Sequence, residues 1–329
     1  MSARLHGRPA GQPDASSLQV LYIAGFGRSG STLLGNIVGS ADGLFSTGEL
    51  HLLWTALAKG SGCGCGERVD RCPVWSAVLD RLASDRGAAP DPAEVREWQL
   101  AEARVVHTPR LLKLAGRGDS GRPTLDRYAG LMGDLYRAIA SVTGARVIVD
   151  ASKTTADAAI LPRVDAIDPA WVHLVRDPRA VAVSQARARP TLDAHRETEM
   201  HRRGVIESAA RWVTANRLTG RLRAAHPGRS TLLRYEDFAA APRDAVSGLL
   251  DLVGAPRDAV SFTDDRTVVL GDNHTVWGNR SRFTSGEVQI KPDEGWRGAS
   301  RLTLATTTLL TAPWLGRYGY PLWPSPVRA

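Results

Sequence analysis

A glycine-rich segment near the start of the chain has the residue types and spacing that bind phosphate. Residues 25–32 read Gly-Phe-Gly-Arg-Ser-Gly-Ser-Thr. Gly25, Gly30 and the two hydroxyl residues that follow have the spacing of a P-loop, whose backbone amides hold phosphate at the start of a helix. Ser31 stands where a P-loop has the lysine that reaches the β- and γ-phosphates. The segment therefore predicts a phosphate site for a nucleotide other than a triphosphate.

A second group of polar residues follows the apolar run at 171–175. Arg176 comes directly after this run, and Pro178 suits the first turn of a helix that would carry Ser184 about two turns further on. An arginine and a hydroxyl that converge can hold a second phosphate through charge-assisted hydrogen bonds. The alternative is that the residues from Arg176 to Arg179 form an ion-pair cluster that caps the helix.

Together, the two motifs resemble those of the sulfotransferases that use 3′-phosphoadenosine 5′-phosphosulfate (PAPS). Residues 28–32 resemble the loop that holds the 5′-phosphosulfate, and Arg176 with Ser184 resembles the 3′-phosphate motif. The similarity covers roughly residues 19–240, and residues 273–283 resemble a late loop of bacterial and carbohydrate-type members. It implies PAPS as donor, 3′,5′-ADP as product and no required metal. The donor-binding residues it implies are Gly27, Arg28, Ser29, Gly30, Ser31, Thr32, Arg176, Ser184, Tyr235, Arg280 and Arg282.

The residues after two other apolar runs distinguish branches of this family. The run 146–150 leads into Asp150-Ala-Ser-Lys153 and has no histidine, unlike the cytosolic small-molecule sulfotransferases. The pair Gly48-Glu49 resembles instead the Gly-Glu pair of the tyrosylprotein branch and its bacterial relatives. The chain is therefore more similar to the tyrosylprotein and carbohydrate-type branch.

This resemblance implies roles for the catalytic residues. Glu49 is our first choice for the general base, Asp150 the second and His51 the third. Lys153, in the position of the family's active-site lysine, would stabilise charge on the leaving phosphate oxygen, and Arg28 would neutralise the phosphosulfate. The alternative for Glu49 is a helix cap or an ion-pair partner of Arg28.

All three cysteines fall within residues 61–73. Cys63, Cys65 and Cys72 could form a three-thiolate metal site with His51 or Asp70 as fourth ligand. The Cys-x-Cys spacing is tight for structural zinc and a second Cys-x-x-Cys pair is missing. We favour buried thiols in a glycine-rich loop, or one local disulfide, and expect no metal.

The pattern of apolar runs predicts the fold. Short runs at 19–24, 45–47, 146–150, 171–175 and 230–235 alternate with helical segments, including 31–40 and 243–252. This alternation predicts a three-layer, P-loop-like α/β fold with a central parallel sheet of about four to five strands. Ligands of such sheets bind beyond the carboxyl ends of the strands.

The remaining segments predict the domain organisation. Residues 1–18, rich in small residues and proline, are expected to be a disordered lead-in to a single domain over 19–323. Residues 51–141 should form a long helical insertion on the acceptor side. The charged stretch 187–223 is expected to be mostly helical, either as a lid or as a solvated surface helix.

Composition limits the partners. The net charge is +8, which favours anionic ligands. The basic residues are scattered without a nucleic-acid-binding motif, so we expect no nucleic acid. No apolar run approaches the ~18 residues of a membrane helix, so a cytoplasmic protein without membrane insertion is expected. The acceptor should be a hydroxylated metabolite, sugar or lipid, and the sequence does not predict the oligomeric state.

Two other functions compete with sulfuryl transfer. In a P-loop kinase or ATPase, residues 147–150 would be a Walker B strand whose Asp150 supports Mg²⁺. Ser31 in place of the P-loop lysine argues against this. A non-catalytic nucleotide-binding protein is the second alternative.

Overall fold

The computed structural model describes residues 17–114, 119–187, 190–193, 196–199 and 202–323. The expected lead-in, residues 1–18, lies almost wholly outside these ranges. The single domain over 19–323 stays a prediction.

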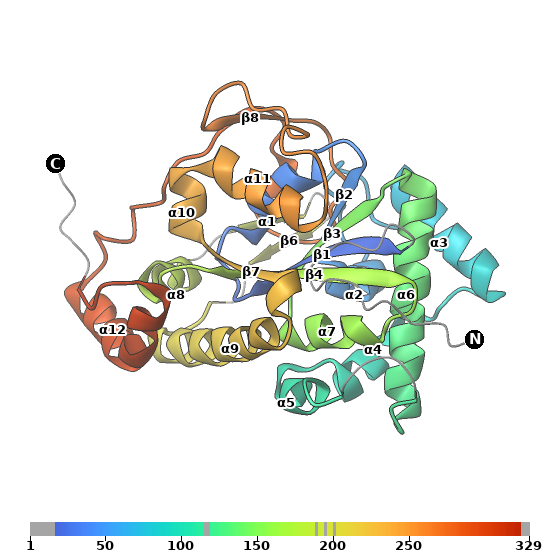
Figure 1. Ribbon diagram of the computed structural model, residues 1–329, viewed down its shortest axis with the longest axis horizontal. Helices are drawn as coiled ribbons and strands as arrows, with labels where there is room; N and C mark the ends of the chain where they lie inside the picture. The colour runs from blue at the N-terminus through green and yellow to red at the C-terminus, as the bar shows by residue number, and fades with distance from the viewer. Residues whose placement is uncertain (1–16, 115–118, 188–189, 194–195, 200–201, 324–329) are drawn as a thin grey trace, which may run out of the picture.

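Five parallel strands form the central sheet, in the order β2-β3-β1-β4-β7 (Figure 1). The strands, in that order, span Leu44–Gly48, Val147–Lys153, Leu18–Gly25, Ile167–Val175 and Ser230–Arg234. β1 lies in the middle, where Leu21 pairs with Val149 of β3 and with Ala170 of β4. All four neighbouring pairs are parallel, which confirms the predicted α/β fold and its sheet.

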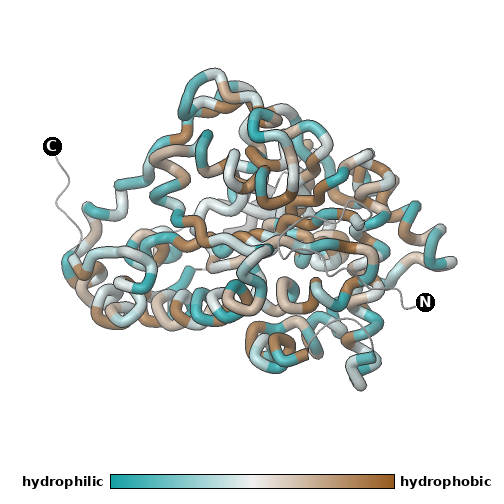
Figure 2. Tube along the Cα trace, viewed as in Figure 1, coloured by the Kyte–Doolittle hydropathy of each residue, from teal (hydrophilic) through white to brown (hydrophobic). Residues whose placement is uncertain are grey.

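Helices cover both faces of this sheet, because alternate residues of each strand point to opposite sides. Val20 and Tyr22 of β1 belong to one buried cluster, and Leu21 and Ile23 belong to another. The first cluster includes side chains of α2 (Leu53–Lys59), α3 (Pro73–Arg86), α6 (Pro123–Thr143) and α7 (Thr155–Ile160). The second includes α1 (Ser31–Gly39), α10 (Tyr235–Ala240) and α11 (Pro242–Leu252). Figure 2 shows apolar residues concentrated along the central strands between these layers.

The other elements surround this core. Residues 51–141 contain α2 to α5 and most of α6, with α4 at Pro92–Glu102 and α5 at Thr108–Leu111. α8 (Pro178–Ala186), α9 (Val205–Ala225) and α12 (Arg301–Leu315) pack together at the β7 end of the molecule (Figure 1). The short antiparallel pair β8 and β9 spans Thr267–Leu270 and Gly286–Gln289. The 3₁₀ turns are Leu50–Leu52, Val105–His107, Leu161–Arg163, Pro227–Arg229, Arg280–Phe283 and Gly316–Tyr318.

The prediction for residues 187–223 was wrong in its first half. An antiparallel hairpin, β5 (Pro190–Asp193) and β6 (Arg196–Glu199), precedes α9. Pro190 cannot donate the amide hydrogen bond of a helix interior, which favours extended backbone at this point. The charge pattern, from which a mostly helical stretch was expected, does not distinguish a helix from a hairpin at this point.

Among the described residues, no helix combines the length and the hydrophobicity that crossing a bilayer requires.

Candidate active site

Each strand of the sheet ends at or just before a residue singled out from the sequence. In sheet order these residues are Glu49 after β2, Lys153 in β3, Gly25 in β1, Arg176 after β4 and Tyr235 after β7. Because parallel strands end at the same edge, all five lie along one edge of the sheet. The chain passes from β1 to β2 on one side of the sheet and later to β4 on the other side. The carboxyl end of β1 is therefore a topological switch point, where α/β proteins bind ligands.

The P-loop has the backbone that an anion site requires. A side chain at Gly25 (φ +147°) would place its Cβ 2.3 Å from the Leu174 carbonyl oxygen, so the turn requires glycine. Gly30, with φ +89°, precedes α1, and no side chain caps this helix. The first amides of α1 are therefore available to a ligand. The buried hydroxyl of Ser29 has no hydrogen-bond partner, which is expected for a group that binds a ligand oxygen.

Arg28 links the P-loop to two distant segments. Its Nε donates to Ser184 Oγ of α8 at 2.9 Å, and its Nη1 donates to Asn279 Oδ1. The backbone amide of Asn279 also donates to Thr32 Oγ1 at 3.3 Å. Ser184 thus contacts Arg28 in this structure, whereas the motif had suggested a partnership with Arg176. Asn279 was not predicted, although it lies in the late loop whose resemblance was noted.

Arg176 is buried against the P-loop. Its Nη1 donates to the Arg28 carbonyl oxygen at 3.0 Å, and its guanidinium lies 4.3 Å from the centre of the Tyr235 ring. Its Nη2 donates to Asp293 Oδ2 at 2.7 Å. Partial burial alone would raise the pKa of Asp293, but the hydrogen bond and charge of Arg176 lower it. The structure therefore places a carboxylate on the arginine for which the sequence predicts a phosphate.

Glu49 and Lys153 form an ion pair on the β2–β3 side of the P-loop. Lys153 Nζ lies 2.7 Å from Glu49 Oε1, and each side chain is 16% exposed. The backbone of Glu49 is held by a hydrogen bond from its amide to the Val276 carbonyl oxygen at 2.8 Å. Lys153 has φ +70°, a left-handed conformation that is strained for a residue with a Cβ. The partner suggested for Glu49, Arg28, is replaced here by Lys153.

The second choice for the base is enclosed. Asp150 is 1% exposed and accepts hydrogen bonds from Tyr136 Oη, at 2.7 Å, and from the Ser152 amide, at 2.9 Å. Burial raises the pKa of Asp150 to about 6, against the opposing effect of these hydrogen bonds. Asp150 is therefore better placed to stabilise the end of β3 than to accept a proton from an acceptor.

His51, the third choice for the base, is paired with a carboxylate. Its Nδ1 lies 2.7 Å from Asp157 Oδ2. Burial alone would lower the pKa of His51, but the Asp157 carboxylate outweighs burial and raises it. Asp70, the other residue considered as a metal ligand beside the cysteines, is paired with Arg68 at 2.7 Å.

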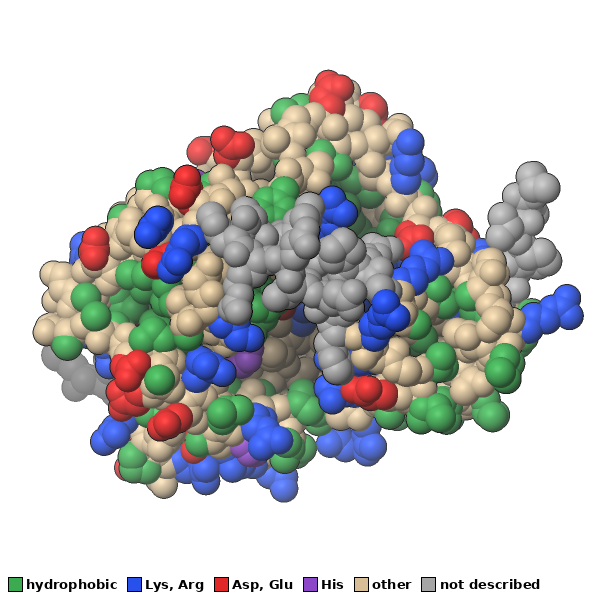
Figure 3. All heavy atoms as spheres, turned by 180° about the vertical axis from the view of Figure 1, so that it is seen from behind, with side chains coloured by type: hydrophobic (Ala, Val, Ile, Leu, Met, Phe, Trp, Pro, Cys, Tyr) green, Lys and Arg blue, Asp and Glu red, His purple; other side chains and the backbone are tan. Residues whose placement is uncertain are grey.

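The late loop lies against the P-loop helix. The 3₁₀ turn that carries Arg280 and Arg282 contacts α1. Arg282 is 3% exposed and lies 4.6 Å from the centre of the Phe283 ring, whereas Arg280 is exposed. Both arginines therefore belong to a turn that packs against the helix of the P-loop. Figure 3 shows further Lys and Arg side chains around a hollow on the face opposite to that of Figure 1.

Comparison with known protein families identifies the family of this chain. A family model described as the sulfotransferase family matches residues 21–259. The chain therefore belongs to the sulfotransferase family.

The similar solved structures include the sulfotransferase domain of the olefin synthase from Synechococcus PCC 7002. It is 21% identical with a TM-score of 0.48, over 97% of this chain and 98% of that one. The sulfotransferase domain from the curacin biosynthetic pathway is 16% identical with a TM-score of 0.47, over 94% and 100%. A sulfotransferase from Alicyclobacillus acidocaldarius is 12% identical with a TM-score of 0.40, over 92% and 96%. No curated protein matches the chain.

Proposed function

We propose that this protein transfers a sulfuryl group from PAPS to a hydroxyl group of a small acceptor, with Glu49 as the general base. The observation that carries the proposal is the Glu49–Lys153 ion pair beside a P-loop that lacks its lysine. It supplies a proton acceptor and a cation next to the predicted phosphosulfate site. No metal is needed for this reaction.

The donor site is formed by residues that fit two separate phosphate groups. The P-loop from Gly27 to Thr32, with its uncapped helix and the unpartnered Ser29 hydroxyl, suits the 5′-phosphosulfate. Arg176, with the late-loop arginines Arg280 and Arg282, suits the 3′-phosphate. Arg176 Nε is buried without a hydrogen-bond partner, so this guanidinium can make one more bond than it makes here.

Asp293 occupies one edge of Arg176 and must give way when the 3′-phosphate binds. Its side chain is 45% exposed, so it can turn into solvent at small cost. A phosphate dianion offers the guanidinium more charge than a carboxylate does. We therefore treat Asp293 as a resident competitor that keeps Arg176 oriented in the absence of donor. Ser184 and Tyr235 hold the two arginines of the site, Arg28 and Arg176, in place.

The reaction is an in-line displacement at sulfur. The acceptor oxygen forms a bond to sulfur while the bond from sulfur to the 5′-phosphate oxygen breaks, and 3′,5′-ADP leaves. Glu49 accepts the proton of the acceptor hydroxyl. Lys153 and Arg28 stabilise the charge that develops on the leaving oxygen, which is where preorganised cations contribute most. Lys153 can interact with both Glu49 and the leaving oxygen, because it is paired with Glu49 and lies at the carboxyl end of β3.

The kinase alternative is weakened by the same geometry. Its Mg²⁺ ligand would be Asp150, but this side chain is buried and bound to Tyr136 and Ser152. Ser31 supplies no charge for a γ-phosphate.

The proposal is tested by incubating the protein with PAPS and a fractionated metabolite extract, then searching for products heavier by one SO₃ group. Such products, formed together with 3′,5′-ADP, support it. Formation of phosphorylated products from ATP by the same protein would contradict it.

A further inference from the structure

Four side chains with metal-binding atoms converge beside β2. The sulfur atoms of Cys63, Cys65 and Cys72 and a ring nitrogen of His274 all lie within 4.8 Å of one another. Cys72 Sγ is 3.2 Å from His274 Nδ1, although the two residues are 202 positions apart in sequence. All three cysteines are free thiols. Sequence reasoning recognised the three thiols but not His274, because nothing local connects it to them.

The spacing and the chemistry of these atoms are those of structural zinc. With Zn–S bonds of about 2.3 Å and Zn–N bonds of about 2.0–2.1 Å, a tetrahedral ion separates its ligand atoms by about 3.5–3.8 Å. The observed ligand atoms, all within 4.8 Å of one another, lie close to that arrangement. Three thiolates and one imidazole are a standard closed ligand set for zinc, with no position left for a reactive water. Thiolates also disfavour Mg²⁺ and Ca²⁺, which take oxygen ligands.

The backbone brings the two ligand-bearing segments into close contact. Gly64, between the first two cysteines, donates its amide hydrogen to the Thr275 carbonyl oxygen at 3.0 Å. A Cβ at Gly64 would lie 2.0 Å from Asn273 Oδ1, so only glycine permits this approach. Trp75 Nε1 donates to the His274 carbonyl oxygen at 2.6 Å. The scaffold around the four ligands is therefore fixed by contacts that do not involve the ligand atoms themselves.

The surroundings also suit bound thiolates. Cys63 and Cys72 are fully buried, and Cys72 immediately precedes α3. The positive end of a helix stabilises a metal-bound thiolate.

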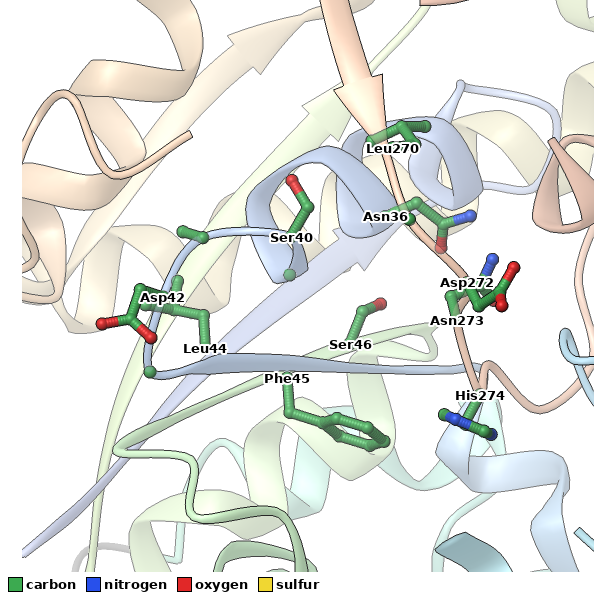
Figure 4. A pocket seen from close by; sticks show the side chains of 14 residues that line it. Asn36, Ser40, Asp42, Leu44, Phe45, Ser46, Leu270, Asp272, Asn273 and His274 are labelled. Carbon is green, nitrogen blue, oxygen red and sulfur yellow. The ribbon is translucent and has the colours of Figure 1, made fainter. Parts of the chain in front are cut away.

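His274 lines a neighbouring pocket, and its Nδ1 lies 3.2 Å from Cys72 Sγ. That pocket, of about 420 Å³, lies between the end of α1, the start of β2 and residues 270–274. In Figure 4 the imidazole lies on the same side of β2 as Phe45, opposite Asn36 and Ser40. Phe45 packs against the buried cluster that contains Cys63 and Cys72.

We propose that Cys63, Cys65, Cys72 and His274 bind one structural zinc ion. Binding releases the thiol protons to solvent and forms three Zn–S bonds and one Zn–N bond. The ion joins the cysteine loop to the segment that contains Val276. This inference does not depend on the transferase activity, and the metal takes no part in the transfer step.

The consequence for the active site runs through Val276. Its backbone pairs with Gly48 on one side and with Cys63 on the other, and its carbonyl oxygen accepts from the Glu49 amide. The same segment continues to Asn279, which contacts Arg28 and Thr32. The zinc ion therefore fixes the backbone that positions Glu49 and the late loop.

The test measures metal content in the whole chain, expressed in zinc-supplemented medium and purified under reducing conditions without chelators. Elemental analysis should find about one zinc per chain. Replacement by Co²⁺ should give the visible absorption of a tetrahedral site together with a thiolate charge-transfer band. Removal of zinc should lower the melting temperature, and adding zinc back should restore it by mass action.

Two ligand variants and one control locate the ion. Cys65→Ser alters a half-buried ligand and His274→Gln keeps a polar side chain, so both are expected to fold and to lose more than about tenfold in zinc affinity. His226→Gln removes an imidazole that stacks on Trp171 and should keep its zinc. Reduced wild-type protein that contains no zinc and takes up none overturns the proposal. Full retention of zinc by His274→Gln would also overturn it. So would a disulfide between two of the cysteines, found in protein purified without reductant, if reduction followed by added zinc did not yield the zinc-bound form.

Discussion

Lys153 Nζ lies 2.7 Å from Glu49 Oε1, across the carboxyl ends of the neighbouring strands β2 and β3. The two side chains are equally exposed, at 16%. They are close enough to solvent for an acceptor to reach them and buried enough for their charges to matter. This pair is the chemical centre of the proposed function.

Glu49→Gln should abolish most transfer while leaving 3′,5′-ADP binding largely unchanged. The amide has the same shape but cannot accept the acceptor's proton, and general bases contribute about 10²–10⁴-fold to rate. The measurement is kcat with an acceptor identified by the extract screen, together with the dissociation constant of 3′,5′-ADP.

Glu97→Gln, on an exposed position of α4, is the matched control and should retain full activity. Unfolding should be measured for both variants, because Glu49→Gln leaves Lys153 without its carboxylate. Normal turnover in Glu49→Gln would place the base elsewhere.

Because the backbone of Lys153 is left-handed, we expect glycine to be more stable than alanine at this position. Lys153→Ala and Lys153→Gly both remove the ammonium and should both slow transfer. Glycine ordinarily destabilises a folded chain relative to alanine, but at φ +70° alanine retains the strain that glycine lacks. Lys153→Gly should therefore be the more stable of the two by about 0.5–1 kcal/mol. Denaturant unfolding of the pair checks this, and a more stable alanine variant would show that the position is unstrained.

Arg176→Ala should weaken 3′,5′-ADP binding by about 1.5–3 kcal/mol, the range for a hydrogen bond to a charged group. This corresponds to roughly 10- to 150-fold in the dissociation constant. Calorimetry with 5′-AMP, which lacks the 3′-phosphate, supplies the control. Binding of 5′-AMP should change far less. Equal losses for both nucleotides would mean that Arg176 only supports the P-loop through the Arg28 carbonyl oxygen.

Replacing Asp293, the carboxylate bound to Arg176, should have the opposite effect on 3′,5′-ADP binding. Asp293→Asn removes the negative charge from Arg176 and should tighten 3′,5′-ADP binding, without a comparable effect on 5′-AMP. Weaker binding in this variant would show that Asp293 helps the donor site instead of competing with its phosphate.

Asp150 predicts a pH dependence of stability. Its pKa rises from 3.8 to about 6 on folding, so between these values the folded state binds more protons than the unfolded state. Its contribution to stability is therefore fully present below about pH 4 and is lost as the pH rises through about 6. Asp150→Asn should remove this component from the pH profile of unfolding while leaving transfer nearly intact. An unchanged profile, or loss of transfer with 3′,5′-ADP binding intact, would contradict the structural role assigned to Asp150.

The local elements of the fold were predictable because their signals are short-range. The glycine spacing of the P-loop and the five apolar runs each lie within a few consecutive residues, and the runs correspond to the five strands of the central sheet. The positions of Glu49, Lys153 and Arg176 at strand ends follow directly once the strands are parallel. Resemblance to a known family then suggested a chemical role for each.

The side-chain partnerships were not predictable in this way. Ser184 contacts Arg28, and Arg176 contacts Asp293 from a segment more than a hundred residues away. His274 joins the three cysteines from the opposite end of the chain. Each partner is set by how loops pack over the sheet edge, and no periodicity in the sequence encodes that packing. The hairpin at 190–199 was missed for a related reason, since charge patterns do not distinguish a surface helix from a surface hairpin.

We propose that the P-loop and Arg176 together bind a nucleotide with separate 5′ and 3′ phosphate groups. Titration calorimetry of the wild-type protein without added Mg²⁺ tests it most directly, with 3′,5′-ADP, 5′-AMP and ATP as ligands and Mg-ATP as the comparison. We expect one 3′,5′-ADP to bind per chain, much more tightly than 5′-AMP or ATP and equally well with or without Mg²⁺. Binding of Mg-ATP with no detectable binding of 3′,5′-ADP would contradict it.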